Sequence, residues 1–234
     1  MNCTADPVLP EIFAGRHRIA VLAPHPDDES LGCGALLARA FAGAGAHVIC
    51  LTDGSASHPG SKEWPPERLA QKRRDELTRA IVHLGGSERD LTWLGLADSK
   101  LYQVDPTRVA SSIARHISAS GALHVFAPAI EDHHEDHKAT VQIAQEVRRR
   151  HPDRAFYSYP VWCRWDDPDF DRDISRHAPC FLATNGYRQQ KRSAIQAHQS
   201  QLGKVIKDDP KGFVLPRAFV DKLIAEDEVF WRMP

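Results

Sequence analysis

An apolar run that stops at a cluster of charges constrains the fold of this chain more than any other stretch. Residues 18–23 (RIAVLA) are short, apolar and flanked by turn signals, which predicts a buried strand. Residues 24–30 (PHPDDES) follow at once and bring together one histidine and three carboxylates. Residues 31–42, rich in Ala and Leu, then predict a helix. Strand, polar turn and helix open a βαβ unit, and open parallel sheets bind ligands at such turns.

The rest of the chain continues this alternation of strands and helices. Apolar runs predict strands at residues 46–52, 91–96, 122–128, 156–161 and 180–184, and helical spacing predicts helices at 65–84, at 105–118, up to 150 and at 188–202. The length fits one sizeable domain. We therefore expect a single Rossmann-like α/β domain over residues 1–234, with a mostly parallel sheet flanked by helices, a core at about 17–205 and a C-terminal extension at 206–234.

Charge and composition narrow the class of partner. Acidic and basic residues nearly cancel, at 31 and 30, and neither forms a long run, so nothing favours nucleic acid or a membrane surface. No apolar stretch approaches the roughly 18 residues of a membrane-spanning helix, and the amino terminus lacks a signal-peptide pattern. We expect a cytoplasmic protein that acts on a small molecule, and a homo-oligomer is compatible with this. The five cysteines are scattered and never spaced as Cys-x-x-Cys, which predicts reduced thiols.

The charged turn is typical of a metal site. Its neighbouring carboxylates, Asp27, Asp28 and Glu29, repel one another directly after a buried strand. A divalent cation removes this difficulty, because imidazole and carboxylate groups are zinc ligands. His25 and Asp28 are three residues apart on one turn, so both can face the same ion.

A second candidate turn follows the strand predicted at residues 122–128. The histidines cluster only there, at His133, His134 and His137, and the last two face one way if a helix starts at this point. Carboxyl ends of parallel strands lie at one edge of a sheet, so the two turns are expected to meet. One histidine of this turn would complete three protein ligands and leave a fourth position for water, as in catalytic zinc sites.

The surplus carboxylate of the first turn predicts a reaction. Asp27 could take a proton from a zinc-bound water, whose pKa the metal lowers to around 7. His134, if it is not a ligand, could donate a proton to the leaving group or stabilise an oxyanion. The chemistry implied is hydrolysis at a carbonyl.

Three motifs resemble one family over most of the chain, from Arg18 to about Phe230. They are His-Pro-Asp-Asp after the first strand, His-x-Asp-His after a later strand and Ala-x-x-x-His-x-Ser-Gln near the carboxyl end. Their order is similar to that of the PIG-L/LmbE-like zinc-dependent N-acetylglucosaminyl deacetylases. The resemblance implies that one zinc ion is bound by three of these side chains, that one carboxylate is the base and that a further histidine assists the tetrahedral intermediate. Carried over residue by residue, the ligands are His25, Asp28 and His137, the base is Asp27 and the assisting group is His134.

The same resemblance implies a substrate class, acetylated amino sugars or their conjugates. It places Arg73, in an Arg-x-x-Glu pattern, and Asp98 near the sugar. His198 of the third motif is a candidate for a role at the pocket. Glu135 departs from the family, which commonly has proline there, and this predicts a different start of the following helix or added charge at the rim.

Other interpretations are compatible with the residues. The acidic turn could only cap a helix, since aspartate is a good N-cap. Gly32-x-Gly34 is part of a dinucleotide pattern, but Leu37 stands at the third glycine position and nearby carboxylates would repel a pyrophosphate. The rival enzyme is a zinc amidase that cleaves a larger acyl group or a thiol conjugate. The rival from another class is a non-catalytic module that binds a nucleotide or a sugar.

Overall fold

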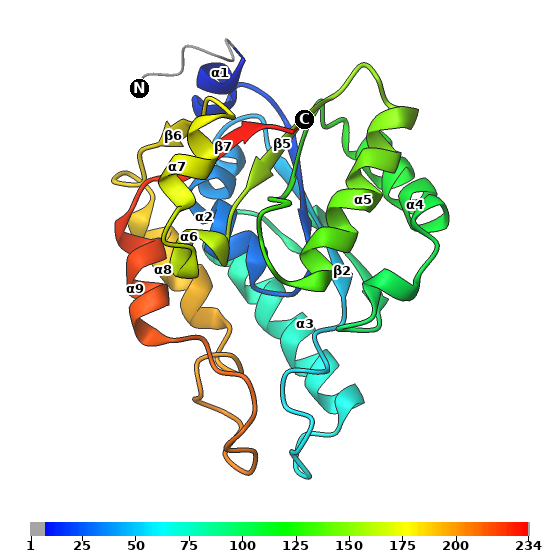
Figure 1. The fold of residues 1–234 in the computed structure, drawn as a ribbon, viewed down its shortest axis with the longest axis vertical. Coiled ribbons are helices and arrows are strands. Elements are labelled where there is room, and N and C mark those ends of the chain that lie inside the picture. The colour runs from blue at the N-terminus through cyan, green and yellow to red at the C-terminus, as the bar shows by residue number, and fades with distance from the viewer. Residues whose placement is uncertain (1–7, 234) are drawn as a thin grey trace.

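Strands of residues 8–233, the part of the chain that the computed structural model describes, form one mixed sheet of seven strands (Figure 1). The strands are β1 (Ile19–Ala23), β2 (Ala46–Thr52), β3 (Leu91–Leu96), β4 (His124–Pro128), β5 (Ala155–Tyr159), β6 (Cys180–Leu182) and β7 (Glu228–Arg232). Their order is β3-β2-β1-β4-β5-β7-β6, and β7 pairs antiparallel with both β5 and β6, whereas the other pairs are parallel. The predicted α/β class with a mostly parallel sheet is therefore confirmed.

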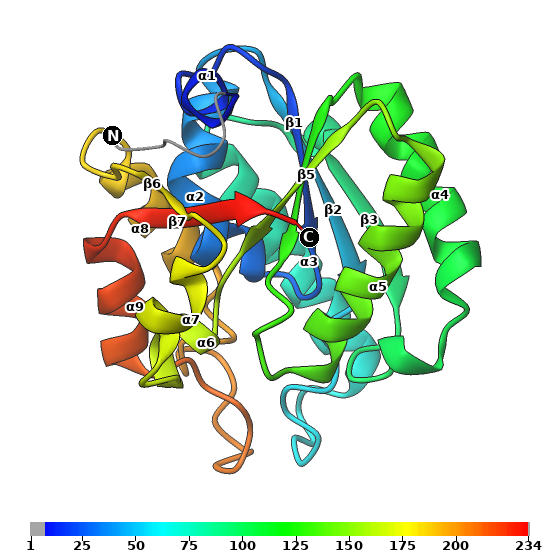
Figure 2. The same ribbon diagram turned by 45° about the horizontal axis from the view of Figure 1, so that its top comes forward.

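Helices cover both faces of the sheet (Figures 1 and 2). One face carries α1 (Leu9–Phe13), α2 (Asp28–Phe41), α3 (Pro66–His83), α8 (Arg188–Ala197) and α9 (Arg217–Ala225), and the other carries α4 (Pro106–Ser120) and α5 (Glu135–Arg150). Strand β1 supplies both cores, since Ile19 and Val21 pack in one cluster and Ala20 and Leu22 in the other. This alternation is the two-residue period of a strand buried on both faces.

Short elements complete the described chain. These are the helices α6 (Cys163–Asp166) and α7 (Phe170–Ser175) and the 3-10 turns η1 (Glu88–Asp90) and η2 (Leu101–Gln103). No helix among residues 8–233 has both the length and the apolar character needed to cross a membrane.

The direction of the connections reverses between β1 and β4. From β1 the chain continues to β2 and β3 on one side, whereas β4 and β5 lie on the other side. β1 and β4 pair directly, with Ile19 opposite His124. Ligands of open α/β sheets bind in the crevice at such a reversal, outside the carboxyl ends of the strands. Both charged turns predicted to meet begin at this point, after β1 and after β4.

Helix α2, which begins inside the acidic turn, lies close against the sheet. Gly32 has no room for a Cβ, because the ring of Tyr159 on β5 occupies that space. The Tyr159 hydroxyl donates to Leu22 O on β1 at 2.8 Å. Glu228 of β7 accepts hydrogen bonds from the backbone N–H groups of Ala35 and Leu36, at 2.7 and 2.9 Å. These contacts fix the helix that follows the first charged turn.

The cysteines differ from the prediction at one position. Cys33, Cys50 and Cys163 are buried and free. Cys180 is disulfide-bonded, so the expectation of reduced thiols is wrong there. Spacing along the chain does not reveal which distant cysteines a fold brings together. Cys3 lies outside the described residues.

Candidate functional site

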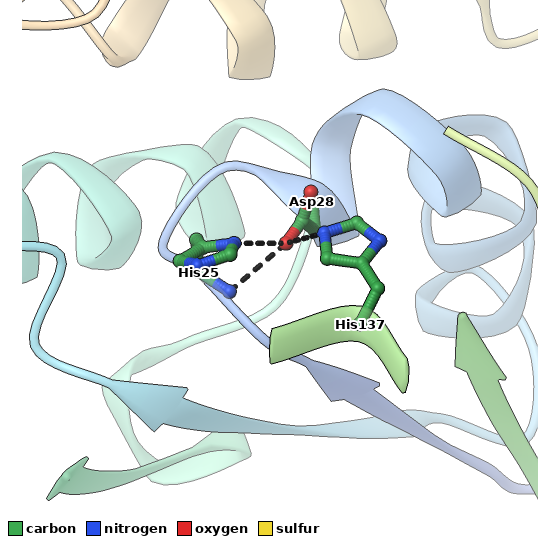
Figure 3. Close-up of side chains that lie close together, drawn as sticks. All are labelled: His25, Asp28 and His137. Atoms are coloured by element: carbon green, nitrogen blue, oxygen red, sulfur yellow. Dashed lines mark hydrogen bonds and ion pairs between the residues drawn. The ribbon is translucent and has the colours of Figure 1, made fainter. Parts of the chain in front are cut away.

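The three residues predicted to bind metal lie together and point toward one another (Figure 3). Asp28 Oδ2 is 3.1 Å from His25 Nδ1 and 3.2 Å from His137 Nε2. One ligand atom from each of the three side chains lies within 4.8 Å of the other two. All three residues are buried. Two sequence motifs separated by more than a hundred residues therefore form one group.

Backbone hydrogen bonds hold the first turn in place. His25 N donates to Asp28 Oδ2 at 2.9 Å, so the carboxylate closes the turn on itself. Thr52, at the end of β2, binds Pro24 O through its N–H at 3.0 Å and its hydroxyl at 2.8 Å. The turn is therefore tied to the neighbouring strand before α2 begins.

A carboxylate that the sequence did not single out orients His137. Asp132 Oδ2 is 2.8 Å from His137 Nδ1. The same carboxylate accepts hydrogen bonds from the N–H groups of Val161 and Cys163, which follow β5. A carboxylate on the second ring nitrogen is the usual partner of a metal-binding histidine, because it fixes the tautomer and the ring orientation. The sequence shows an acidic run at residues 131–136, but its spacing does not tell which member faces inward.

The residues present fit a divalent cation. His137 Nε2 is buried and has no well-directed hydrogen bond, although Asp28 lies close to it. Burial alone would lower the pKa of His137, but the negative charges of Asp28 and Asp132 raise this pKa to about 9. Burial alone would raise the pKa of Asp28. The charge of His137 outweighs the effect of burial, so the pKa of Asp28 lies well below its ordinary value. A positive charge between Asp28 and His137 would therefore be stabilised, and the carboxylate and imidazole donors are those that zinc prefers.

His25 is surrounded by carboxylates on both ring nitrogens. Besides Asp28 on Nδ1, its Nε2 lies 3.3 Å from Asp136 Oδ2 and 3.4 Å from Asp98 Oδ1. Burial lowers the pKa of His25, but these three carboxylates raise it well above its ordinary value. Asp98 also accepts a hydrogen bond from Ala56 N at 2.9 Å. Asp98 lines the cavity and also contacts a predicted ligand, His25.

Asp27, the surplus carboxylate, is paired with Arg73. Arg73 Nη2 donates to Asp27 Oδ2 at 3.1 Å, and both side chains are buried. The guanidinium is itself held by Gly54 O, which accepts from Nη1 at 2.9 Å. Burial raises the pKa of Asp27, and the charge of Arg73 opposes that increase. Arg73, predicted near the sugar, lines the same cavity and fixes the carboxylate beside the predicted ligands.

His134 lies next to the metal-binding group as a neutral imidazole. Its ring centroid is 4.6 Å from that of His25 and 5.5 Å from that of His137. Burial first, and then the charges of these two histidines, lower the pKa of His134 to about 4. The N–H of Asp136 donates to His134 Nδ1 at 3.1 Å, so the proton of the neutral ring is on Nε2. The following helix starts at Glu135, the position that departs from the family pattern.

His198 lies behind the cavity. It is buried, and its Nε2 is 3.2 Å from Glu29 Oε1. Glu29, a carboxylate of the acidic turn for which no role was predicted, is fully buried as its partner. His198 is not among the residues that line the cavity, so no direct contact supports its predicted role in substrate binding.

A single cavity of about 200 Å³ joins these groups. Of the eight predicted site residues, six line it: His25, Asp27, Asp28, Arg73, Asp98 and His134. The wall also contains Ser57, Trp162, Gln201 and Phe213, which the sequence did not identify. Only Gln201 had a signal, its place in the third motif.

A family model described as GlcNAc-PI de-N-acetylase (PIG-L) matches residues 20–148. The 1D-myo-inositol 2-acetamido-2-deoxy-alpha-D-glucopyranoside deacetylase of Kineococcus radiotolerans is 40% identical to this chain over 103 residues. That alignment covers 40% of this chain and only 28% of the relative's length.

Solved structures share the fold over nearly the whole chain. The N,N'-diacetylchitobiose deacetylase from Pyrococcus horikoshii superposes with a TM-score of 0.69 at 20% identity, covering 97% of this chain and 87% of that protein. The deacetylase of the A40926 pseudoaglycone gives a TM-score of 0.70 at 22% identity, covering 93% and 97%.

Proposed function

Because the chain belongs to the family of GlcNAc-PI de-N-acetylases (PIG-L), we propose that it removes the N-acetyl group from an N-acetylglucosamine-type sugar or sugar conjugate by hydrolysis. One observation carries the proposal. A buried group of two histidines and one aspartate is suited to a metal ion, and two of its members, His25 and Asp28, line the same cavity as Asp27, a carboxylate outside that group.

The proposed ligands are His25, Asp28 and His137, with one zinc ion per chain. When bound, zinc supplies a Lewis acid that polarises a carbonyl and lowers the pKa of a water molecule. The three residues leave room for substrate because the cavity opens beside them. Asp132 supports this assignment, since it occupies the other ring nitrogen of His137.

Asp27 is the proposed general base. Its buried position raises its pKa, which makes the carboxylate a stronger base toward an attacking water. Arg73 holds one carboxylate oxygen and thereby sets the direction of the other. In this proposal, Asp27 then delivers the proton it has taken to the departing amine nitrogen.

His134 is the proposed donor to the oxyanion. Its Nδ1 is occupied by the N–H of Asp136, which leaves the proton on Nε2 free to be donated. A neutral imidazole can stabilise a developing negative charge by a hydrogen bond without giving up its proton. This favours oxyanion stabilisation over the alternative of proton donation to the leaving group.

The size of the cavity favours a small acyl group. Its volume of about 200 Å³ lies below the roughly 300 Å³ at which pockets for drug-sized ligands begin. An acetamido sugar is therefore a better match than the larger acyl group of the rival amidase.

A cytoplasmic location stays a prediction.

Release of acetate tests the proposal. Zinc-loaded protein should release acetate from a panel of N-acetylglucosamine glycosides, detected by mass spectrometry. A chelator should abolish the release, and added zinc should restore it. Release that persists without metal, or an active protein that prefers a longer acyl chain in competition assays, would contradict the proposal.

A further inference from the structure

Two long loops are tied together over the cavity. The loop at residues 53–65 joins β2 to α3 and the loop at residues 198–216 joins α8 to α9, and both extend beyond the carboxyl ends of the strands (Figure 1). Asp208 accepts three hydrogen bonds from residues 61–63 at 2.6 to 2.9 Å, and Asp209 accepts one from the same loop at 2.8 Å. We call the two loops the collar.

The collar fixes the position of Phe213. The N–H of Phe213 donates to Ser57 O of the other loop at 2.7 Å. Gly212 has no room for a Cβ, because the ring of His58 fills that space. The two loops are therefore packed against each other at the residue that precedes Phe213.

Phe213 and Trp162 form an aromatic wall on the cavity. Their ring centroids lie 5.8 Å apart in an edge-to-face arrangement. Trp162 stacks on Phe219 of α9, with centroids 4.8 Å apart, so its ring is fixed. Phe213 is nevertheless 39% exposed. An ordered aromatic side chain that faces water at a cavity is typical of a binding surface.

We propose that this aromatic wall binds an apolar aglycone attached to the amino sugar. The inference rests on the proposed function, in which the acetamido group lies against His25, Asp27 and Asp28. The cavity of about 200 Å³ is too small for a larger conjugate, so the rest of the substrate must leave through the mouth. The collar adds Phe213 to the cavity wall besides Ala56, Ser57 and Gln201, and Trp162 adds the second ring. An alkyl or aryl aglycone would cover Phe213 and shield it from water.

Binding of three glycosides tests the inference without catalysis. The probes are the methyl, octyl and phenyl glycosides of N-acetylglucosamine, titrated calorimetrically into zinc-loaded Asp27→Asn protein, in which turnover is expected to be slow. The octyl or the phenyl glycoside should bind about tenfold more tightly than the methyl glycoside, which corresponds to the burial of a modest apolar surface. Phe213→Ala should remove this preference. Phe181→Ala, at a residue of β6 that is 47% exposed and lies outside the cavity wall, should keep it.

The outcomes separate the inference from the proposed function. Equal affinity for the three glycosides, or no binding of any, would overturn the inference. An equal loss on all three in Phe213→Ala would also overturn it, because the ring would then stack on the sugar itself. Acetate release is measured on the same glycosides with zinc-loaded protein. Its absence would count against deacetylation, whereas the binding preference would still stand.

Discussion

Asp132 and Glu29 show what a sequence pattern leaves open at the scale of single residues. The motifs identified the histidines and carboxylates that the structure brings together at the first and second turns. Asp132 and Glu29 are both fully buried and contact His137 and His198, yet they looked like members of an acidic run. Charge and spacing predict which side chains are able to bind a metal. Which carboxylate faces the ring nitrogen of which histidine depends on the tertiary packing.

Loss of the carboxylate on His137 should weaken metal binding. We expect Asp132→Asn to lower zinc affinity by about 10- to 100-fold, because the ring loses the group that orients it and raises its basicity. Competition with a chromophoric chelator measures this affinity. Glu131→Gln, on the same loop but paired with His177 at 2.9 Å, should bind zinc as the wild type does. Equal affinities of Asp132→Asn and the wild type would contradict the orienting role.

His47 should make the fold sensitive to acid. Burial, followed by the charge of His116, lowers the pKa of His47 in the folded protein. The unfolded chain, with a histidine pKa near 6.5, therefore binds more protons, so stability falls as pH falls through that value. Chemical unfolding of the wild type and of His47→Gln at several pH values between 7 and 5 should show a smaller loss in the variant. Parallel pH profiles would contradict this prediction.

At the scale of elements, the bounds of a strand were predicted well where charged residues follow the strand. The strands that lead into the two charged turns were predicted to within two residues, because an apolar run followed by charges marks the end clearly. The last helix was predicted to run to residue 202 but ends at Ala197. β7 and α9 were not predicted. β7 is held by pairing with β5 and β6, which its own five residues do not reveal.

A buried ion pair connects β7 to α8. Lys191 Nζ lies 2.8 Å from Glu228 Oε1, and both side chains are 1% exposed. We expect Lys191→Met to lower the free energy of unfolding by about 3–5 kcal/mol, because Glu228 would remain as a buried charge without its counterion. Denaturant titration measures the change. Adding Glu228→Gln should recover part of the loss.

The exposed pair of Arg217 and Asp221, 3.7 Å apart, offers a control. Arg217→Met should change stability by less than about 1 kcal/mol, since both partners remain in water. An equally small effect of Lys191→Met would show that the buried pair does not stabilise the fold.

The whole molecule brings the site together through the order of its strands. The expectation that two charged turns share one edge of the sheet follows from parallel strands alone. That β1 and β4 are direct neighbours, at the reversal of the connections, depends on the complete topology. The aromatic part of the cavity also depends on the complete topology. Trp162 and Phe213 come from segments without a chemical motif, so the sequence gives no sign that they meet. The sequence therefore predicts the reacting groups better than the surface that selects a substrate.

The most direct measurement of the central claim compares zinc content and acetate release in the same samples of the wild type and Asp27→Asn. An amide in place of the carboxylate leaves the three proposed ligands in place and removes the base. We expect full zinc occupancy by elemental analysis in both proteins. Acetate release by the variant should fall by at least about 100-fold, the lower range for loss of a general base. A fully zinc-loaded variant that releases acetate at the wild-type rate would contradict the proposed mechanism.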